Sequence, residues 1–123
     1  MRIREHAKEL VRLMARRSDP RFDFRHGAAI IKNSKIIAVG HNYADGRNLG
    51  NEMIYTIHAE IDAINHTNIR ALRGATMVLC AEQHKGYAKC SRPCPNCFQI
   101  MRKLGFKQVI YSTPDGWEKE NLR

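Results

Sequence analysis

The chain has 123 residues, a formal net charge of +9 at pH 7 and four cysteines. This length suits one domain with a hydrophobic core and excludes two domains of ordinary size, so we expect a single domain over residues 1–123. No apolar run approaches the roughly 20 residues that cross a bilayer, and the charged N-terminal residues lack the apolar core of a signal peptide. We therefore expect no membrane association, a cytoplasmic location and reduced cysteines.

Hydrophobic periodicity predicts a helix near the N-terminus, followed by a hairpin. Apolar residues recur at helical spacing over residues 3–17, and the sequence Ser-Asp-Pro at residues 18–20 is expected to end that helix. Two short apolar runs, at residues 27–31 and 36–39, are typical of paired strands. The polar residues 32–35 between them have the composition of a turn.

Helices and strands are predicted to alternate in the second half of the chain. An apolar stripe of isoleucines predicts a helix that opens near His58, and residues 75–81 predict a buried strand. Residues 94–104 predict a helix that Gly105 ends, and residues 109–112 predict a fourth strand. Together these elements favour an α/β fold with helices packed on a sheet.

The C-terminal segment predicts one more strand. Residues 113–116, Thr-Pro-Asp-Gly, are a strong turn signal, and residues 117–122 are short enough to return as an antiparallel fifth strand. A terminal helical turn over residues 117–123 is the alternative. The prediction is a mixed sheet of about five strands.

Two motifs supply the residue types of a metal site with a proton carrier. His58-Ala59-Glu60 offers an imidazole and a carboxylate, and Pro93-Cys94-Pro95-Asn96-Cys97 offers two thiols one helical turn apart. Three protein ligands leave a position on zinc for water, whereas structural zinc normally has four. We predict zinc ligation by His58, Cys94 and Cys97, with Glu60 as the proton carrier. Helix N-termini are expected to favour the thiolates, and zinc to favour them more.

This compound pattern, His-x-Glu followed by Pro-Cys-x-x-Cys, resembles the cytidine and deoxycytidylate deaminase superfamily. The resemblance extends to FRHGAAIIKNSKIIAVGHN at residues 24–42 and to LGFKQVIYS at residues 104–112. It implies a three-layer α/β/α fold of the cytidine deaminase type, a Zn²⁺ cofactor and a homo-oligomer. Within the superfamily, an antiparallel last strand resembles the free cytidine deaminases, because deoxycytidylate and tRNA adenosine deaminases place a further helix before a parallel fifth strand.

The resemblance implies hydrolytic deamination of the cytosine ring of a free nucleoside or nucleotide, such as cytidine, deoxycytidine or dCMP. Zinc would activate a water, and Glu60 would carry its proton first to the ring and then to the leaving amine. Asn42, Ala59 and Arg92 are the implied substrate-binding residues.

Two of these residues also suit roles that involve no substrate. Asn42 also suits an ordinary turn, because its side chain can bond its own backbone, and Arg92 is equally compatible with a solvent-facing side chain. Adjacent strand residues point to opposite faces, so a pocket-facing Asn42 places His41 outside. The Gly- and Asn-rich residues 43–53 are expected to form a loop that borders the pocket.

The remaining cysteines and histidines do not predict a second site. Cys80 lies in an apolar strand and is expected in the core, whereas Cys90 is a spare thiol near the zinc loop. With His84 they do not match a four-ligand zinc set. His26 and His66 have no convincing partner in the sequence, so core or surface roles are predicted for them.

The net charge of +9 leaves nucleic acid open as a partner. A deaminase that acts on cytosine or adenine in single-stranded DNA or RNA is therefore the alternative function, although evident aromatic platforms for stacking bases are scarce. A non-catalytic zinc module is a third class, and Glu60 argues against it. Much of the charge lies on the first predicted helix, where a solvated face is the favoured interpretation, on Arg2, Arg4, Lys8, Arg12, Arg16 and Arg17.

Overall fold

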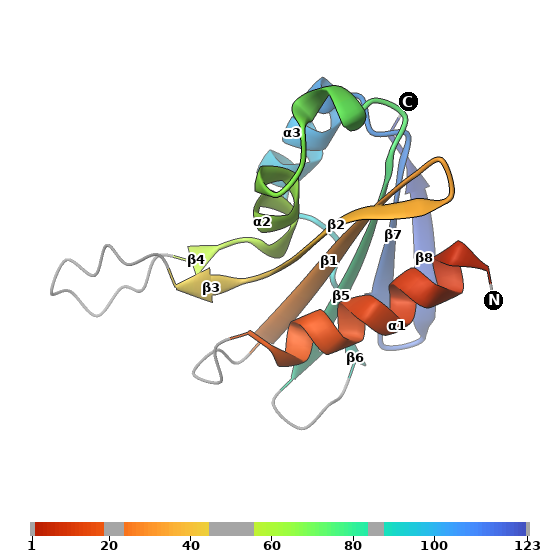
Figure 1. Cartoon of the computed structure of the whole chain (residues 1–123). Coiled ribbons are helices and arrows are strands. Elements are labelled where there is room, and N and C mark those ends of the chain that lie inside the picture. The colour runs from red at the N-terminus through yellow and green to blue at the C-terminus, as the bar shows by residue number, and fades with distance from the viewer. Residues whose placement is uncertain (1, 19–23, 45–55, 84–87, 123) are drawn as a thin grey trace, which may run out of the picture.

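A mixed sheet separates one helix from two others (Figure 1). The computed structural model describes residues 2–18, 24–44, 56–83 and 88–122. The helices within these ranges are α1 (Ile3–Arg16), α2 (Ala59–Asn65), α3 (Pro95–Leu104) and a single 3₁₀ turn, η1 (Ile69–Ala71). The longer strands are β1 (Phe24–Lys32), β2 (Lys35–His41), β5 (Thr76–Gln83), β7 (Gln108–Thr113) and β8 (Gly116–Asn121).

The strand order is β2-β1-β5-β7-β8, and it confirms the predicted mixed sheet. β5 and β7 run parallel, while the β1–β2, β1–β5 and β7–β8 pairs are antiparallel. β8 returns beside β7 through the turn at Pro114–Asp115, so the predicted antiparallel last strand is confirmed and the helical alternative is wrong.

Three two-residue strands were not predicted from the sequence. β6 (Ala88–Lys89) pairs with β5, and β3 (Tyr43–Ala44) pairs with β4 (Thr56–Ile57) in a separate ribbon. The segment expected to be a loop from residue 43 therefore begins as a strand, and its residues 45–53 lie outside the described ranges. Partners distant in sequence stabilise such short strands, so local periodicity does not reveal them.

The helices approach the sheet closely because glycines face them. A Cβ on Gly27 would lie 2.0 Å from the backbone oxygen of Val11, so α1 packs directly against β1. A Cβ on Gly40 would lie 2.5 Å from the backbone nitrogen of Ala63, so α2 packs directly against β2. Because a side chain at either position would collide with backbone, these glycines set the two layer spacings.

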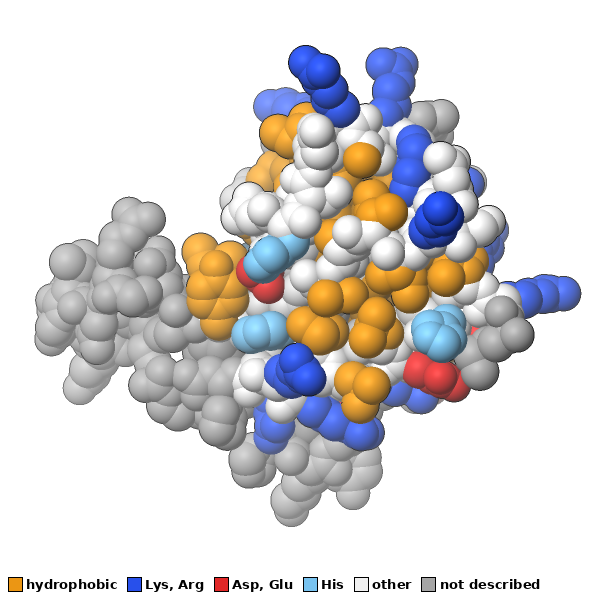
Figure 2. Space-filling model, viewed as in Figure 1, with side chains coloured by type: hydrophobic (Ala, Val, Ile, Leu, Met, Phe, Trp, Pro, Cys, Tyr) orange, Lys and Arg blue, Asp and Glu red, His pale blue; other side chains and the backbone are white. Residues whose placement is uncertain are grey.

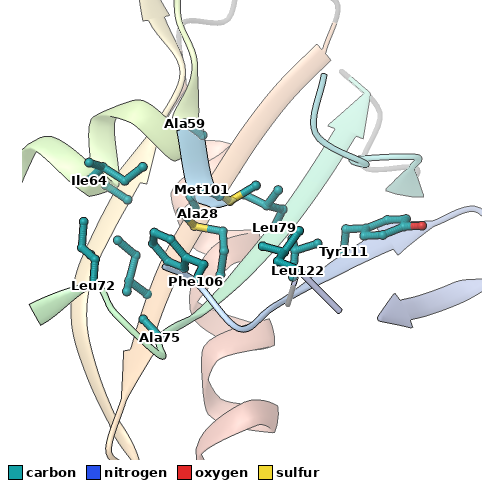
Figure 3. Packing of buried hydrophobic residues seen from close by; sticks show 14 of the residues in the cluster. Ala28, Ala59, Ile64, Leu72, Ala75, Leu79, Met101, Phe106, Tyr111 and Leu122 are labelled. Carbon is teal, nitrogen blue, oxygen red and sulfur yellow. The ribbon is translucent and has the colours of Figure 1, made fainter. Parts of the chain in front are cut away.

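The larger hydrophobic cluster lies between the sheet and the α2–α3 layer (Figure 3). Phe106, Met77, Met101 and Leu72 are among its fully buried side chains. A smaller cluster lies under α1, where one helical stripe packs against the opposite face of the sheet; its buried members are Ala7, Val11, Ala29, Ile31, Val78, Cys80 and Ile110. Apolar layers thus cover both sides of the sheet, as a three-layer α/β domain requires.

Most of the α1 cations that the sequence analysis assigned to a solvated face are exposed, whereas Lys8 is half-buried. Lys8 and Arg12 lie 5.3 and 5.6 Å from the centre of the Trp117 ring, and Arg16 lies 3.6 Å from Glu82. In the view of Figure 2, hydrophobic side chains gather over α1 and the neighbouring part of the sheet, with Lys and Arg around them. None of the described helices has the length and apolar character needed to span a membrane.

Candidate metal centre and active site

Both sequence motifs lie at the start of a helix on the same side of the sheet. His58 is the N-cap of α2, and Cys94 is the N-cap of α3, with Pro95 in its first turn. Proline suits this position because the first helical N–H has no partner within the helix. Cys97 lies three residues after Cys94 and therefore on the same side of the helix. The predicted placement of both motifs at helix starts is confirmed.

The side chains of His58, Cys94 and Cys97 converge. His58 Nδ1 lies 3.4 Å from Cys97 Sγ and 4.0 Å from Cys94 Sγ, and the three ligand atoms lie within 4.8 Å of one another. Tetrahedral zinc, with bonds of about 2.0 Å to nitrogen and about 2.3 Å to sulfur, holds such ligands about 3.6 Å apart. The donor set and its spacing therefore fit Zn²⁺.

Glu60 is a buried carboxylate beside this cluster, with 6% of its surface exposed. Burial raises the pKa of the Cys97 thiol, and the negative charge of Glu60 raises that pKa further, as do hydrogen bonds with Cys94 and Glu60. Burial and the adjacent carboxylate therefore disfavour the thiolate of Cys97, so metal binding has to displace a proton from this thiol. The expected contribution of the helix terminus to the thiolate stays a prediction.

α2 is fixed to the end of β2 by a polar contact as well as by Gly40. Asp62 is buried and its Oδ2 accepts a hydrogen bond of 3.0 Å from the backbone N–H of His41. Ala59 is fully buried in the same layer, and its predicted contact with substrate stays a prediction. The consequence is a fixed register between the motif at the start of α2 and the residues that follow β2.

Asn42 is buried at this strand end, with 8% of its surface exposed. Its Oδ1 accepts a hydrogen bond of 2.8 Å from the backbone N–H of His26, and its own backbone N–H donates to the His26 carbonyl at 3.2 Å. Asn42 is thus held against β1 rather than bonded to its own turn. Its predicted contact with substrate stays a prediction.

His26 is a site neighbour that the sequence analysis missed. Burial lowers the pKa of its imidazole; the negative charge of Glu60 opposes this change, and the nearby His58 adds to it. His26 therefore lies within electrostatic reach of both halves of the His58-Ala59-Glu60 motif. Its position two residues before the core residue Ala28, on the same strand face, was the signal available in the sequence.

Arg92 is engaged by another side chain. Its Nε and Nη2 donate to the two carboxylate oxygens of Glu120 on β8, at 2.7 and 3.2 Å, and its guanidinium lies 4.5 Å from the Phe98 ring centre. The Arg92 guanidinium and the Tyr111 hydroxyl hold the pKa of Glu120 below its usual value. The predicted role of Arg92 in substrate binding therefore competes with an existing partner.

The residue before Arg92 fastens the ligand loop to the sheet. Ser91 is buried, and its hydroxyl lies within hydrogen-bond distance of the Leu79 carbonyl and of the carbonyl and hydroxyl of Ser112. The Ser91 backbone N–H also donates to the Ser112 carbonyl at 2.9 Å. The loop that carries Cys94 is thus bonded to both β5 and β7.

The structure gives no second metal cluster among its described residues. Cys80 is buried in the core, as predicted, and burial raises its pKa to about 11. Cys90 is exposed, and His84 lies outside the described ranges. His58, Cys94 and Cys97 are the group of three potential ligands within those ranges.

Comparison with known proteins agrees with this geometry. The family model of the cytidine and deoxycytidylate deaminase zinc-binding region matches residues 1–113, whereas no curated protein sequence matches the chain. The chain is similar in fold to the apo dCMP deaminase of cyanophage S-TIM5, at 23% identity and a TM-score of 0.63, over 89% of this chain and 81% of that one.

Two bacterial structures extend the likeness. The cytidine deaminase of Burkholderia pseudomallei gives a TM-score of 0.65 at 19% identity, over 96% of this chain and 91% of that one. The cytidine deaminase of Mycobacterium leprae gives a TM-score of 0.60 at 19% identity, over 94% of this chain and 91% of that one. These likenesses confirm the predicted fold. Because the family model spans most of its length, the chain belongs to the cytidine and deoxycytidylate deaminase family and is a zinc-dependent deaminase.

Proposed function

We propose that this protein hydrolyses the exocyclic amine of cytosine in a free nucleoside or nucleotide, with water as co-substrate and ammonia and the uracil form as products. The observation that carries the proposal is the convergence of His58, Cys94 and Cys97 within 4.8 Å beside the buried Glu60. Zinc held by these three side chains would supply a Lewis acid that makes water reactive near neutral pH.

Glu60 is the proton carrier in this proposal. Its carboxylate accepts a proton from the attacking water, delivers a proton to the ring nitrogen next to the amine-bearing carbon, and later protonates the departing amine. Burial suits this role, because a carboxylate away from bulk water exchanges its proton with the bound substrate. The position of Glu60 in the first turn of α2, two residues after His58, keeps it beside the metal ligands.

Asn42 is the proposed contact for the sugar. Its hydrogen bonds with the His26 backbone fix the side chain at the end of β2, and Asp62 ties that strand end to α2. The backbone at Ala59, in the first turn of α2, is the other proposed contact, since first-turn N–H groups lack helical partners. Arg92 reaches a substrate phosphate only if it leaves Glu120.

The proposed substrates include nucleotides as well as nucleosides. The similar S-TIM5 dCMP deaminase has been solved in complex with dCMP and dUMP, at 21% identity and a TM-score of 0.63 to this chain. The net charge of +9 favours phosphate-bearing ligands in general. It also favours the alternative, deamination within single-stranded nucleic acid.

The placement of the basic residues of α1 weighs against that alternative, whereas the exposed Arg102 and Lys103 of α3 lie on the same side of the sheet as the metal cluster. The exposed cations of α1 lie on the outside of the helix that covers one face of the sheet, whereas the metal cluster lies at the starts of α2 and α3 on the other face. A strand bound along α1 would have its phosphates on the far side of the sheet from Glu60. We therefore propose a small-molecule substrate.

The test measures ammonia release by zinc-loaded protein from cytidine, deoxycytidine, CMP, dCMP, dCTP, guanine and a cytosine-containing single strand. Glu60→Ala is expected to keep its zinc and to lose turnover by about 100-fold or more. Glu9→Ala, at an exposed glutamate of α1, is the matched control and should behave as the parent protein. Turnover of the single strand alone would favour the alternative, and full activity of Glu60→Ala would contradict the mechanism.

A further inference from the structure

We propose that His26 is a substrate-contacting residue that donates a hydrogen bond to the 2-carbonyl oxygen of the pyrimidine. The inference rests on the proposed function and adds a residue that determines how the base is held. It starts from the position of His26 on β1, between the residue proposed for the sugar and the residue proposed for proton transfer.

The strand register places the His26 side chain on the face that carries the site. Gly27, its neighbour, faces α1, because a Cβ there would meet the backbone of Val11. Ala28 belongs to the hydrophobic cluster shared with α2 and α3. Since side chains alternate along a strand, His26 points to the same face as Ala28, which is the face of α2 and α3. Its partner on β5 is Ala81, a buried residue with a small side chain.

Backbone hydrogen bonds fix His26 from two sides. Its N–H donates to Asn42 Oδ1 at 2.8 Å, and its carbonyl accepts from the Asn42 N–H at 3.2 Å and from the Ser18 hydroxyl at 3.2 Å. These bonds fix the main chain of His26, and strand alternation turns its side chain to the face of α2 and α3. They also make His26 and Asn42 one rigid unit, so a ligand positioned by one is positioned relative to the other.

The electrostatic neighbours of the imidazole show where it lies. Glu60 and His58 are the charged groups that act on it, and burial keeps it neutral near pH 7. A neutral imidazole has one N–H donor and one acceptor nitrogen. His26 is therefore suited to a hydrogen bond with a neutral polar atom and unsuited to pairing with a phosphate.

The 2-carbonyl oxygen of cytosine is a neutral hydrogen-bond acceptor that His26 could contact. The 2-carbonyl lies between the ring nitrogen that bears the sugar and the ring nitrogen that is protonated during deamination. Asn42 is proposed at the sugar and Glu60 at the protonated nitrogen, so the residue between them faces the 2-carbonyl. The backbone N–H of His26 is bonded to Asn42, and its imidazole lies within electrostatic reach of Glu60.

The test compares three His26 variants on the free cytosine compound that the parent protein turns over best. His26→Gln keeps a donor, His26→Phe keeps a ring without a donor, and His26→Ala removes both. His26→Phe and His26→Ala should lower kcat/KM by about tenfold, mainly through KM, with zinc content unchanged; His26→Gln should recover part of the loss. The matched control is His6→Gln, at an exposed histidine of α1.

A sulfur-for-oxygen change in the substrate identifies the bonded atom. The parent protein should prefer cytidine to 2-thiocytidine because sulfur is the weaker acceptor, and His26→Phe should lose most of that preference. An unchanged preference in His26→Phe would overturn the inference, and so would zinc loss in every His26 variant, which would make His26 a support of the metal site. If the parent protein turns over no free cytosine compound, both the proposed function and this inference are wrong. If the parent protein is active and the His26 variants have the same kcat/KM, only this inference is wrong.

Discussion

The face of the sheet under α1 differs from the face under α2 and α3 in how polar groups are used. On the α1 side, cations of the helix contact solvent, Trp117 or Glu82, whose carboxylate is a buried charge in a mainly apolar layer. On the other side, buried Glu60, Asp62 and Asn42 lie where the first turn of α2 meets the end of β2.

The residues that give the protein its net charge are therefore different from the residues that fit the reaction. The groups that are most numerous, the exposed arginines and lysines, are the ones least constrained by packing. The groups that fit a reaction are few, buried and held by named hydrogen bonds, which keeps them oriented before a ligand arrives. The comparison predicts that disturbing the α2–α3 side changes activity, whereas equal damage on the α1 side changes stability.

The largest effect is expected from the metal cluster. Cys97→Ser should abolish zinc binding at stoichiometric metal and reduce turnover to background, because one soft ligand of three is replaced by a poor one. Removal of zinc by a chelator should have the same effect on the parent protein, with recovery on adding Zn²⁺. Zinc content by mass spectrometry and ammonia release provide the measurement.

Cys90→Ser is the matched control for that experiment, since Cys90 is exposed and lies outside the cluster. It should retain both zinc and activity. A Cys97→Ser protein that held zinc as tightly as the parent would contradict the assigned ligand set.

Substitution of Gly27 and of Gly40 tests the comparison, because each introduces a similar steric clash on one face of the sheet. Gly27→Ala and Gly40→Ala each force a methyl group into helix backbone, at 2.0 Å from Val11 O and 2.5 Å from Ala63 N, so each should destabilise the fold by about 3 kcal/mol or more. Gly40→Ala should also lower kcat, because it displaces α2 and with it Glu60. Urea unfolding and steady-state kinetics below the unfolding transition measure the two effects.

Each glycine variant is the control for the other. The comparison of faces fails if Gly27→Ala reduces kcat of the folded protein as much as Gly40→Ala does. It also fails if Gly40→Ala is destabilised with kcat intact, because the register between β2 and α2 would then be irrelevant to the reaction.

Local patterns predicted the elements whose cause is local. The stripe that contains Ala7 and Val11 predicted α1, and the ligand residue types with their spacing predicted the metal cluster. Gly105 ends α3 with a φ of 87°, a left-handed conformation that glycine adopts without strain. These features depend on residues within a few positions of one another, so a single sequence is sufficient to recognise them.

Contacts between segments distant in the sequence could not be predicted from such local patterns. The bidentate pair of Arg92 with Glu120 joins residues 28 positions apart, and the bond between His26 and Asn42 depends on how β1 lies beside β2. β1 also extends beyond its apolar run because it pairs with β5 as far as Phe24 and Gln83. Strand alternation predicted that Asn42 and His41 point to opposite faces, but only the register showed that His26 lies beside Asn42.

The smallest effect is expected at the edge of the site, where Glu120 on β8 holds Arg92. Arg92 and the Tyr111 hydroxyl lower the pKa of Glu120, so the ion pair stabilises the fold above the usual glutamate pKa and this contribution is lost as the pH falls through the lowered value. Glu120→Gln should therefore be slightly less stable than the parent at pH 7, and the difference should vanish at acid pH. The effect should be much smaller than that of either glycine variant, because both side chains are partly exposed.

Urea unfolding at pH 7 and at a series of lower pH values measures this difference, and Glu118→Gln is its control. Glu118 also accepts the Tyr111 hydroxyl, at 3.2 Å, so the control keeps the Arg92–Glu120 pair and changes only the tyrosine contact. A difference for Glu120→Gln that persists in acid would show that lost packing, not charge, causes it. If Glu120→Gln instead strengthens the binding of dCMP over deoxycytidine, Glu120 restrains Arg92 from the phosphate, and the exposed edge of the sheet then contributes to substrate choice as well as the buried face.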